Sequence, residues 1–202
     1  LAVGQPSPVR RVADVMRGEE TQVMGVLQNL TVEAAGDLLI GLPGSHSKWV
    51  EVVDGCITRF DTFMTGEVFA VLSEHSILGR TQQQGAAFDG QAFDRGVQVA
   101  LSADAELGVL STLFSARTLG LTGELSPTAQ ADYLSGLMIG HELAALATAQ
   151  RRRRDNPNLP SIILIGNAQL CTRYSRALDA CGFANVTLAE QATERGLWQL
   201  AL

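Results

Sequence analysis

Two strand-like runs flank an aspartate-glycine pair in the first third of the chain, and this arrangement constrains the fold most strongly. The runs Lys48 to Val53 and Cys56 to Phe60 are rich in β-branched and aromatic residues, with Asp54-Gly55 between them. Asp-Gly is a residue pair that tight two-residue hairpin turns prefer. A short apolar run over residues 37–41 precedes the pair. The sequence therefore predicts three consecutive strands, the last two of which form a hairpin.

Helical patterns lie on both sides of these strands. Apolar residues at three- and four-residue steps predict a short amphipathic helix that begins near Glu19 and includes Leu30. A second helix is expected over residues 65–73, with Thr65 available as its N-cap. Residues 81–96 are expected to form a loop, and residues 97–114 are weakly helical.

A long helix is expected from Ser126-Pro127 to about Arg153, because serine favours the cap and proline the first helical turn. The residues expected on its core-facing side are Leu134, Met138, His141 and Ala145. After it come a buried strand at residues 161–165, a helix through Leu178, a short strand at residues 185–188 and a final helix. This order predicts an α/β fold without internal repeats.

Composition and charge exclude several classes of function. The 202 residues are enough for one large domain or two small ones with a buried core. A net charge of −6 argues against binding to nucleic acid or to an anionic membrane, since neither polyanion is attracted to an acidic surface. The basic run Arg151 to Arg154 is interpreted as a solvated helix end.

The cysteines and the hydropathy pattern indicate a cytoplasmic protein. The three cysteines are odd in number and lack CxxC spacing, which suits a reducing compartment; Cys171 and Cys181 are expected to lie on or beside a core-facing helix. No signal-like N-terminal segment is present and no apolar run reaches about 18 residues, so secretion and membrane spanning are not expected.

The first candidate site is the loop Gly44-Ser45-His46-Ser47-Lys48. Phosphate groups need convergent backbone N–H groups, which glycine permits by close approach and positive φ, together with hydroxyl donors and a cation. Gly44, Ser45, Ser47 and Lys48 supply these groups, and His46 lies among them. The alternative is an ordinary polar hairpin loop. The spacing of a Walker A loop is absent.

Two weaker candidates accompany this loop. Glu19 and Glu20 stand at a predicted helix start, where a carboxylate can act as a general base or hold Mg²⁺ through water, although the helix dipole alone also favours acidic residues there. Gly166-Asn167 follows a predicted strand and opens a helix, a place where ligands often bind in α/β sheets and also a common turn. His75 and His141 are expected to be structural, and the histidines lack metal-ligand spacing.

Taken together, these segments resemble the 2-dehydro-3-deoxygalactonokinases, a family of sugar-acid kinases in the actin-like ATPase superfamily. The string at residues 43–49, Pro-Gly-Ser-His-Ser-Lys-Trp, is similar to the family's phosphate hairpin, with Ser45 where threonine is expected. The string at residues 18–22 resembles the Gly-Asp-Gln-Gln-like segment of sugar kinases that carries the catalytic base, with glutamate replacing aspartate. Residues 163–178 resemble the superfamily's adenosine motif.

The resemblance implies a mixed sheet with flanking helices, the C-terminal lobe of an actin-like ATPase (ribonuclease H-like) fold. It implies ATP-dependent phosphorylation of 2-dehydro-3-deoxy-D-galactonate to its 6-phosphate in galactonate catabolism, with ATP and Mg²⁺ as cofactors and the sugar acid as substrate. The base would be Glu19 or Glu20. The implied contact residues are, for phosphate, Gly44, Ser45, His46, Ser47 and Lys48; for nucleotide, Gly166, Asn167, Gln169 and Arg173; and for the sugar acid, Arg17 or Arg80.

The expected domain map places the whole of residues 1–202 in that C-terminal lobe. Residues 1–14 would be an incoming loop, 15–80 the catalytic helix and phosphate hairpin, 81–125 an insertion, and 126–202 the adenosine-binding units. The N-terminal lobe with an early Asp-x-Gly-Thr hairpin has no counterpart, so we expect an incomplete kinase. Two rival hypotheses stay open: a non-catalytic nucleotide- or sugar-acid-binding module, and a structural or dimerising domain. A homodimer is also left open.

Overall fold

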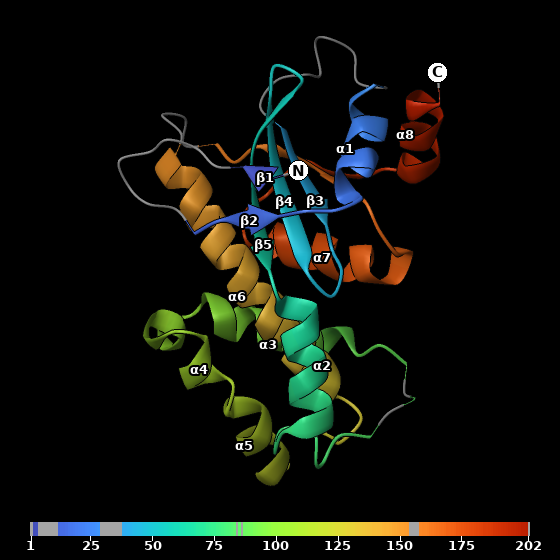
Figure 1. Ribbon diagram of the computed structural model, residues 1–202. Coiled ribbons are helices and arrows are strands. Elements are labelled where there is room, and N and C mark those ends of the chain that lie inside the picture. The colour runs from blue at the N-terminus through green and yellow to red at the C-terminus, as the bar shows by residue number, and fades with distance from the viewer. Residues whose placement is uncertain are drawn as a thin grey trace. The chain divides into compact units, whose positions relative to one another are not determined.

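The computed structural model describes residues 2–3, 12–28, 38–83, 85, 87–153 and 158–201, and its helices and strands follow an α/β order (Figure 1). The chain divides into two compact units. The sheet unit comprises Leu1–Phe63, Pro160–Cys171 and Asn185–Leu202, and the helical unit comprises Met64–Leu159 and Thr172–Ala184. Within the described ranges, no helix combines the length and the apolar character that crossing a membrane would require.

A five-stranded mixed sheet forms the centre of the sheet unit. Its strand order is β5-β4-β3-β6-β7, in which β3, β4 and β5 pair antiparallel while β6 and β7 run parallel to β3. The strands are β3 (Leu38–Leu42), β4 (Ser47–Val53), β5 (Cys56–Phe63), β6 (Ser161–Leu164) and β7 (Val186–Leu188). The predicted mixed sheet is confirmed. A separate two-stranded ladder joins β1 (Ala2–Val3) to β2 (Asp14–Val15).

The hairpin between β4 and β5 has the turn that its sequence predicts. Asp54 and Gly55 both have positive φ, 49° and 74°, as a type I′ turn requires. The ladder is not regular, because a bulge interrupts it next to Glu51 and Val52. Beyond the bulge the register is shifted by one residue, so that Lys48 lies opposite Thr62.

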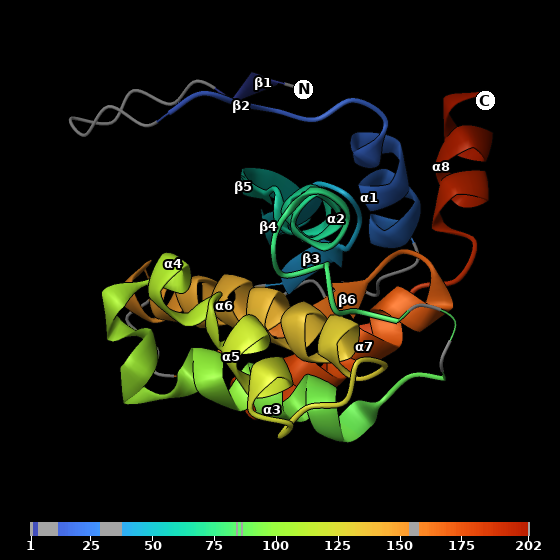
Figure 2. The ribbon, with the colours of Figure 1, turned by 90° about the horizontal axis from the view of Figure 1, so that it is seen from below.

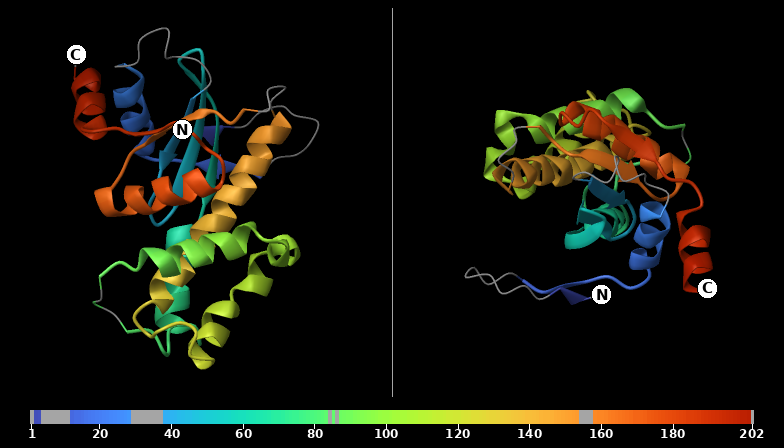
Figure 3. Two further views of the ribbon diagram at one scale, coloured as in Figure 1. Left: turned by 180° about the vertical axis from the view of Figure 1, so that it is seen from behind. Right: turned by 90° about the horizontal axis from the view of Figure 1, so that it is seen from above.

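Two helices cover one face of this sheet. They are α1 (Glu19–Leu27) and α8 (Ala192–Leu200), which stand beside each other in both views of Figure 3. Their backbones touch at two glycines: a Cβ on Gly25 would lie 2.0 Å from the carbonyl oxygen of Ala192, and one on Gly196 would lie 1.9 Å from that of Thr21. The core beneath them is made of buried apolar side chains, among them Val23, Val26, Leu38, Ile40, Leu42, Val50, Val52, Phe60 and Ala192.

The helical unit is built around the crossing of α3 (Gly90–Leu101) and α6 (Gln130–Arg153), which Figure 2 shows from below. Glycines again permit a close approach, since a Cβ on Gly136 would lie 2.0 Å from the carbonyl oxygen of Phe93. The other helical elements are α2 (Thr65–His75), the 3₁₀ helix η2 (Ala103–Leu107), α4 (Val109–Thr112), α5 (Ser115–Leu121) and α7 (Ala168–Ala180), whose first turn belongs to the sheet unit.

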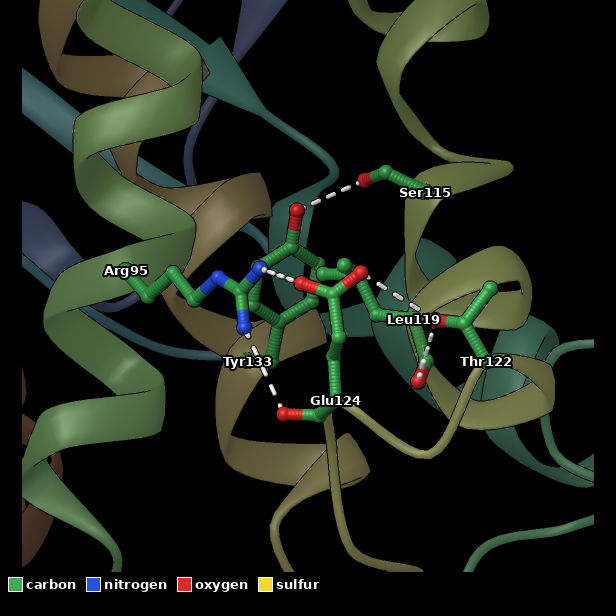
Figure 4. A network of polar contacts seen from close by, with 6 residues as sticks. All are labelled: Arg95, Ser115, Leu119, Thr122, Glu124 and Tyr133. Carbon is green, nitrogen blue, oxygen red and sulfur yellow. Dashed lines mark hydrogen bonds and ion pairs between the residues drawn. The ribbon is translucent and has the colours of Figure 1, made fainter.

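A polar network ties three of these helices together (Figure 4). Arg95 of α3 donates to a carboxylate oxygen of Glu124 at 2.7 Å, and the pKa of Glu124 is held below its usual value by hydrogen bonds from Arg95 and Thr122. The hydroxyls of Ser115 in α5 and Tyr133 in α6 lie 2.7 Å apart. The segment after α5 is thus fixed to α3, and α5 itself is joined to α6.

Two sequence expectations in this unit are wrong and a third is confirmed. Thr65 is the first residue of α2, and its N-cap is Met64, which makes no side-chain cap bond. Residues 81–96 do not form one loop, because α3 begins at Gly90 with Asp89 as its N-cap; the Asp89 carboxylate accepts from the amides of Gln91 and Ala92. Residues 97–114 are helical as expected, divided among the end of α3, η2 and α4.

The long helix α6 differs from the prediction in two respects. It begins at Gln130, after a turn in which the Ala129 amide donates to Ser126, and it ends at Arg153 as expected. Ala145, expected on the core-facing side, is exposed. Residues 132–140 of α6 are buried on nearly all sides, so they define no single core-facing stripe that continues to residue 145. Arg151 to Arg153 are exposed, in agreement with a solvated helix end. Leu30, Asp37 and Arg154 lie outside the described residues.

Candidate active site

The candidate site lies in the sheet unit, at the edge of the sheet where the strands β3 and β6 end. Because β3 and β6 are parallel neighbours, their carboxyl ends meet at this edge, and the amide of Ile165 donates to the carbonyl of Gly41 at 2.9 Å. The chain then departs in opposite directions, from β3 to β4 on one side and from β6 through α7 to β7 on the other. Ligands of open α/β sheets typically bind outside the strand ends at such a point.

The loop from Gly44 to Lys48 joins β3 to β4 at this edge. Ser45 and His46 are exposed, Gly44 is half-buried, and Ser47 and Lys48 are buried. Nothing lies within 4 Å of the place where a Cβ on Gly44 would be. Gly44 is not among the described residues with positive φ, so the backbone freedom expected of it is not used. What this glycine provides is open access to the loop backbone.

The acidic helix start and the phosphate-loop candidate, which are separate in sequence, meet in the structure. The Nζ atom of Lys48 lies 4.0 Å from Oε1 of Glu19, and the Lys48 side chain is only 7% exposed. Lys48 is the single lysine among the 202 residues, which contain 14 further basic residues, all arginines. The one ammonium side chain of this sequence therefore stands beside a carboxylate at the strand-end edge.

Both glutamates of α1 fold back onto the turn that precedes the helix. Oε2 of Glu19 accepts from the amide of Arg17 at 2.8 Å, and Oε2 of Glu20 accepts from the amide of Gly18 at 2.7 Å. Gly18 is the N-cap with φ of 106°, a conformation that residues with a Cβ rarely adopt. Glycine before the glutamates thus allows the chain to turn sharply and hold both carboxylates. Of the two, Glu19 is the one paired with Lys48.

Two residues that the sequence did not single out lie on the Lys48 side of the sheet. Thr62 is directly opposite Lys48 across the β4–β5 ladder, and directly opposed residues of an antiparallel pair point to the same face. Its hydroxyl donates to Oδ1 of Asp14 at 2.8 Å, and the amide of Val15 donates to the same oxygen at 2.8 Å. The bulge hides this pairing from the sequence, and nothing in the spacing of Asp14 indicates it.

The strand-glycine-helix candidate is at the same edge. The Cβ position of Gly166 lies 3.4 Å from the carbonyl oxygen of Pro43, so Gly166 is next to the loop that begins there. Asn167 caps α7, because its Oδ1 accepts from the amides of Gln169 and Leu170 at 2.9 and 3.3 Å. The side chain of Gln169 is exposed. Cys171 is buried behind this turn, and burial raises the pKa of its thiol.

The three arginines of the predicted site lie in different settings. Arg17 is exposed beside the glutamates in the sheet unit. Arg80 is exposed in the helical unit, in the turn after α2. Arg173, also in the helical unit, donates to Asp132 at 2.7 Å and stacks on the ring of Phe88 with its guanidinium carbon 4.5 Å from the ring centre. The Arg173 guanidinium is therefore already bound to protein groups.

The three histidines lie in different surroundings, and the roles expected of His46, His75 and His141 stay predictions. His141 lies 2.7 Å from the hydroxyl of Thr112, and burial lowers its pKa. His75 is exposed near Glu74. In the part of the chain that the structure describes, no three side chains of the histidine, cysteine, aspartate or glutamate type gather as metal ligands.

Comparison with known proteins shows which family this chain resembles in sequence. A family model described as 2-keto-3-deoxy-galactonokinase matches residues 3–200. A protein of Rhizobium meliloti (strain 1021), named as a probable 2-dehydro-3-deoxygalactonokinase, is 37% identical in an alignment 194 residues long that covers 93% of this chain and 59% of that protein. The 2-dehydro-3-deoxygalactonokinase of Escherichia coli (strain K12) is 32% identical in an alignment 191 residues long that covers 93% of this chain and 60% of that protein.

A solved structure shares the fold as well. A crystal structure from Sinorhizobium meliloti that carries the same kinase name aligns with a TM-score of 0.82 and 31% identity, over 99% of this chain and 68% of that one. This chain spans about three fifths of the length of the two curated relatives. On the match of the family model over nearly every residue, the chain belongs to the 2-keto-3-deoxy-galactonokinase family.

Proposed function

We propose that the protein to which this chain belongs transfers the γ-phosphoryl group of ATP to the terminal hydroxyl of 2-dehydro-3-deoxy-D-galactonate, giving the 6-phosphate and ADP. Family membership and the names of the relatives support this reaction, which is a step in galactonate catabolism. The observation that carries the proposal is the contact between Glu19 and Lys48 beside an accessible loop at the carboxyl ends of β3 and β6.

Glu19 is the proposed general base. As the substrate oxygen bonds to the γ-phosphorus, the hydroxyl proton passes to Glu19, and the bond from phosphorus to the β-phosphate oxygen breaks to release ADP. Glu19 is favoured over Glu20 because its Oε1 faces Lys48, the cation that would meet the phosphoryl oxygens. Its other oxygen is held by the Arg17 amide, which fixes the orientation of the carboxylate.

The loop from Gly44 to Lys48 is the proposed phosphate clamp. The open space above Gly44 lets a phosphate oxygen approach the backbone amides, and the exposed side chains of Ser45 and His46 would add polar groups around it. The hydroxyl of Ser47 is buried and would have to be uncovered to take part. Lys48 would share its charge between Glu19 and the transferred group. Fixed donors of this kind stabilise negative charge on the phosphoryl oxygens as it redistributes in the transition state.

Glu20 fits a role in holding Mg²⁺. Magnesium usually keeps several waters and binds one or two carboxylates together with substrate phosphates. Oε2 of Glu20 accepts from the Gly18 amide, and within the described residues Oε1 of Glu20 accepts no hydrogen bond, so it presents a hard oxygen donor at the helix start. When bound, the ion would neutralise charge on the phosphate chain.

The remaining contacts complete the proposal. Gly166, Asn167 and Gln169 would meet the nucleotide, since a helix N-terminus next to an open glycine suits phosphate or ring approach. Arg173 would have to share its guanidinium with Asp132 to take part. Arg17 is the preferred partner for the carboxylate of the sugar acid, because it is exposed beside Glu19, and Arg80 is the alternative.

The domain map forms part of the proposal. We take the chain as the C-terminal lobe of a two-lobe kinase, with segments at residues 1–14, 15–80, 81–125 and 126–202. The chain covers 59% and 60% of the two relatives, which supports a second lobe in the complete protein. ATP and the sugar acid are the proposed partners, and the charge of −6 argues against nucleic acid as a partner. Dependence on ATP also favours a cytoplasmic location for the complete protein. A homodimer is a further proposal, which the mass of the complete protein in solution would test.

The test is an assay of ADP release by the complete protein with and without 2-dehydro-3-deoxy-D-galactonate. The proposal predicts ADP release that depends on the sugar acid and on Mg²⁺, with one sugar phosphate formed per ADP. Tight binding of nucleotide without ADP release would instead identify a binding module and would end the kinase proposal.

A further inference from the structure

We propose that Asp14 and Thr62 are positioning residues for the turn of residues 15–18. This turn leads into α1, carries Arg17 and orients Glu19. All of these residues belong to the sheet unit. The consequence for catalysis rests on the proposed function, whereas the positioning itself can be measured without turnover. Neither Asp14 nor Thr62 is a proposed contact of substrate or nucleotide, so any effect on the reaction would pass through the turn.

The turn before α1 has a glycine where it enters the helix, so it needs support from outside. Gly18 is the N-cap and has φ of 106°. Glycine permits this conformation, but it is also the residue with the widest choice of backbone conformations. The amide of Arg17 donates to Oε2 of Glu19 at 2.8 Å. The orientation of the Glu19 carboxylate therefore depends on where the turn holds the Arg17 amide.

One anchor of the turn is apolar. Met16 is 4% exposed and belongs to the same buried cluster as Val23 and Val26 of α1. A methionine side chain is unbranched and adapts to irregular gaps, so its burial alone leaves the direction of the backbone open. The ladder of β2 with β1 is only two residues long and is separate from the five-stranded sheet. The turn therefore needs a directional contact with the sheet as well.

The hydrogen bond between Thr62 and Asp14 supplies this contact. The Thr62 hydroxyl donates to Oδ1 of Asp14 at 2.8 Å, and the amide of Val15 donates to the same oxygen at 2.8 Å. Both bonds go to a carboxylate, and hydrogen bonds to a charged acceptor are stronger than those between neutral groups. Through this shared acceptor, strand β5 is tied to the first residue of the turn.

The register of the β4–β5 ladder puts Thr62 where it can make this bond. Beyond the bulge, Phe60 lies opposite Val50, and both belong to the core beneath α1. Met16 is part of that core too. Because side chains alternate along a strand, Thr62 is on the same face as Phe60. Its hydroxyl therefore points to the side of the sheet on which α1 and its preceding turn lie.

Two groups of the proposed site depend on this turn. Oε2 of Glu19 is held by the turn, while its Oε1 lies 4.0 Å from Nζ of Lys48. The Arg17 side chain is exposed on the turn itself. Loosening the turn would misorient the proposed base and displace the proposed partner of the sugar acid's carboxylate. The loop from Gly44 to Lys48 lies on another segment, so the effect should be larger for the sugar acid than for ATP.

Hydrogen exchange measures the positioning directly in the complete protein. The amides of Arg17 and Gly18 both donate to glutamate side chains, so they exchange faster when the turn opens. Thr62→Val removes the hydroxyl at nearly constant volume. It should raise their exchange rate by at least about threefold, the scale of one lost hydrogen bond, as followed by mass spectrometry of the peptide. Exchange in the buried strand β3 should keep the wild-type rate, which distinguishes a local effect from general destabilisation.

Further variants separate the hydrogen bond from packing and charge. Asp14→Ala removes the acceptor of both bonds and should raise the exchange rate at least as much as Thr62→Val. The double variant should match Asp14→Ala within error, because the bond from Thr62 is already lost there. Thr62→Ser keeps the hydroxyl and Asp14→Asn keeps an acceptor oxygen, so each should keep the wild-type rate.

Thr58→Val is the matched control. It removes a hydroxyl that donates to the carbonyl of Glu51 near the other end of β5, and the turn amides should then exchange as in wild type. Equal rates in wild type and Thr62→Val would overturn the proposal. A raised rate in Thr62→Ser or in Thr58→Val would also overturn it, because packing or the strand as a whole would then hold the turn.

Kinetics separate this inference from the proposed function. In the complete protein, Thr62→Val should lower kcat and raise KM for the sugar acid, each by at least about threefold, while KM for ATP changes by less than about twofold. Thr62→Ser should restore the wild-type values. A change confined to KM for ATP would contradict an effect through the turn. If the wild-type protein has no kinase activity, the proposed function fails, and the exchange rates still decide whether Asp14 and Thr62 position the turn.

Discussion

The Nζ atom of Lys48 lies 4.0 Å from Oε1 of Glu19, and this contact joins the start of helix α1 to the start of strand β4. Neither residue alone indicates catalysis, because acidic residues are common at helix starts and lysines are common in loops. At the carboxyl ends of two parallel strands, the buried Lys48 and the half-buried Glu19 place a cation and a carboxylate side by side. This combination is what phosphoryl transfer to a hydroxyl requires.

The two glutamates should differ in their effect on turnover. Glu19→Gln removes the proposed base and should lower kcat by at least about a hundredfold, the range typical of a lost general base. Glu20→Gln keeps an oxygen that can accept from the Gly18 amide, and it should cost less than about tenfold at saturating Mg²⁺. Steady-state kinetics with both substrates would measure this. A larger loss in Glu20→Gln than in Glu19→Gln would reverse the assignment.

Removing the ammonium should affect ATP more than the sugar acid. Lys48→Ala should raise KM for ATP and lower kcat, because the lysine meets the phosphoryl group, while KM for the sugar acid should change little. Arg195→Ala is a suitable control, since it removes an exposed charge from α8 in the same unit. Unchanged kinetics for ATP in Lys48→Ala would show that this lysine serves only the fold.

Replacement by alanine should lower stability at one glycine of the sheet unit and affect ATP binding at another. Gly196→Ala places a methyl group 1.9 Å from the carbonyl oxygen of Thr21, so α8 must move away from α1, and we expect a loss of roughly 1–3 kcal/mol in the free energy of unfolding. Gly44→Ala meets no atom within 4 Å and should leave stability unchanged while raising KM for ATP. Denaturant unfolding and kinetics on both variants would test this. Stability lost in Gly44→Ala, or retained in Gly196→Ala, would contradict the packing described for each position.

How much of this could be read from the sequence differs between the parts of the chain. The order of strands and helices followed from periodicity and from signals such as Asp54-Gly55, since tight turns depend on local conformational preference. The start of α3 was missed because glycine and glutamine around Gly90 are typical of loops, although Asp89 offered a cap signal. The core-facing side of α6 was mispredicted at Ala145 because residues 132–140 are buried on nearly all sides and define no stripe that continues to residue 145.

The candidate site shows the same division. Glu19, the Gly44 loop and Gly166 could be selected by residue type, but their meeting at one edge depends on the parallel pairing of β3 with β6. Thr62 could not be found by counting back from the Asp54-Gly55 turn. A regular hairpin would place Asp61 opposite Lys48, and only the bulge beside Glu51 moves Thr62 into that position.

Stability of the helical unit should depend on the protonation of His141. Burial lowers the pKa of His141 below its ordinary value of 6.5, so the folded chain binds fewer protons than the unfolded chain. This contribution is present above about pH 6.5 and is lost as the pH falls through the lower folded pKa. His141→Gln keeps a polar group near Thr112 without titrating, and it should flatten the pH dependence of unfolding between about pH 7 and 5.

Two carboxylates of the helical unit, Asp94 and Glu124, should affect the free energy of unfolding at more acidic pH. The pKa of Asp94 is lowered by its hydrogen bond to Arg176 and that of Glu124 by Arg95, so their contributions are lost only as the pH falls below about 4.5. Urea unfolding at several pH values separates the two ranges. Identical slopes for wild type and His141→Gln above pH 5 would show that His141 does not titrate with folding.

The most direct test of the account is whether MgATP protects Lys48 from acetylation in the complete protein. If Lys48 meets the phosphate chain, saturating MgATP should lower its acetylation rate by at least about tenfold, and Gly44→Ala should weaken that protection. A non-hydrolysable ATP analogue should protect equally, and adenosine should not. The same acetylation rate with and without MgATP would place the nucleotide phosphates elsewhere and contradict the assignment of this edge of the sheet as the kinase site.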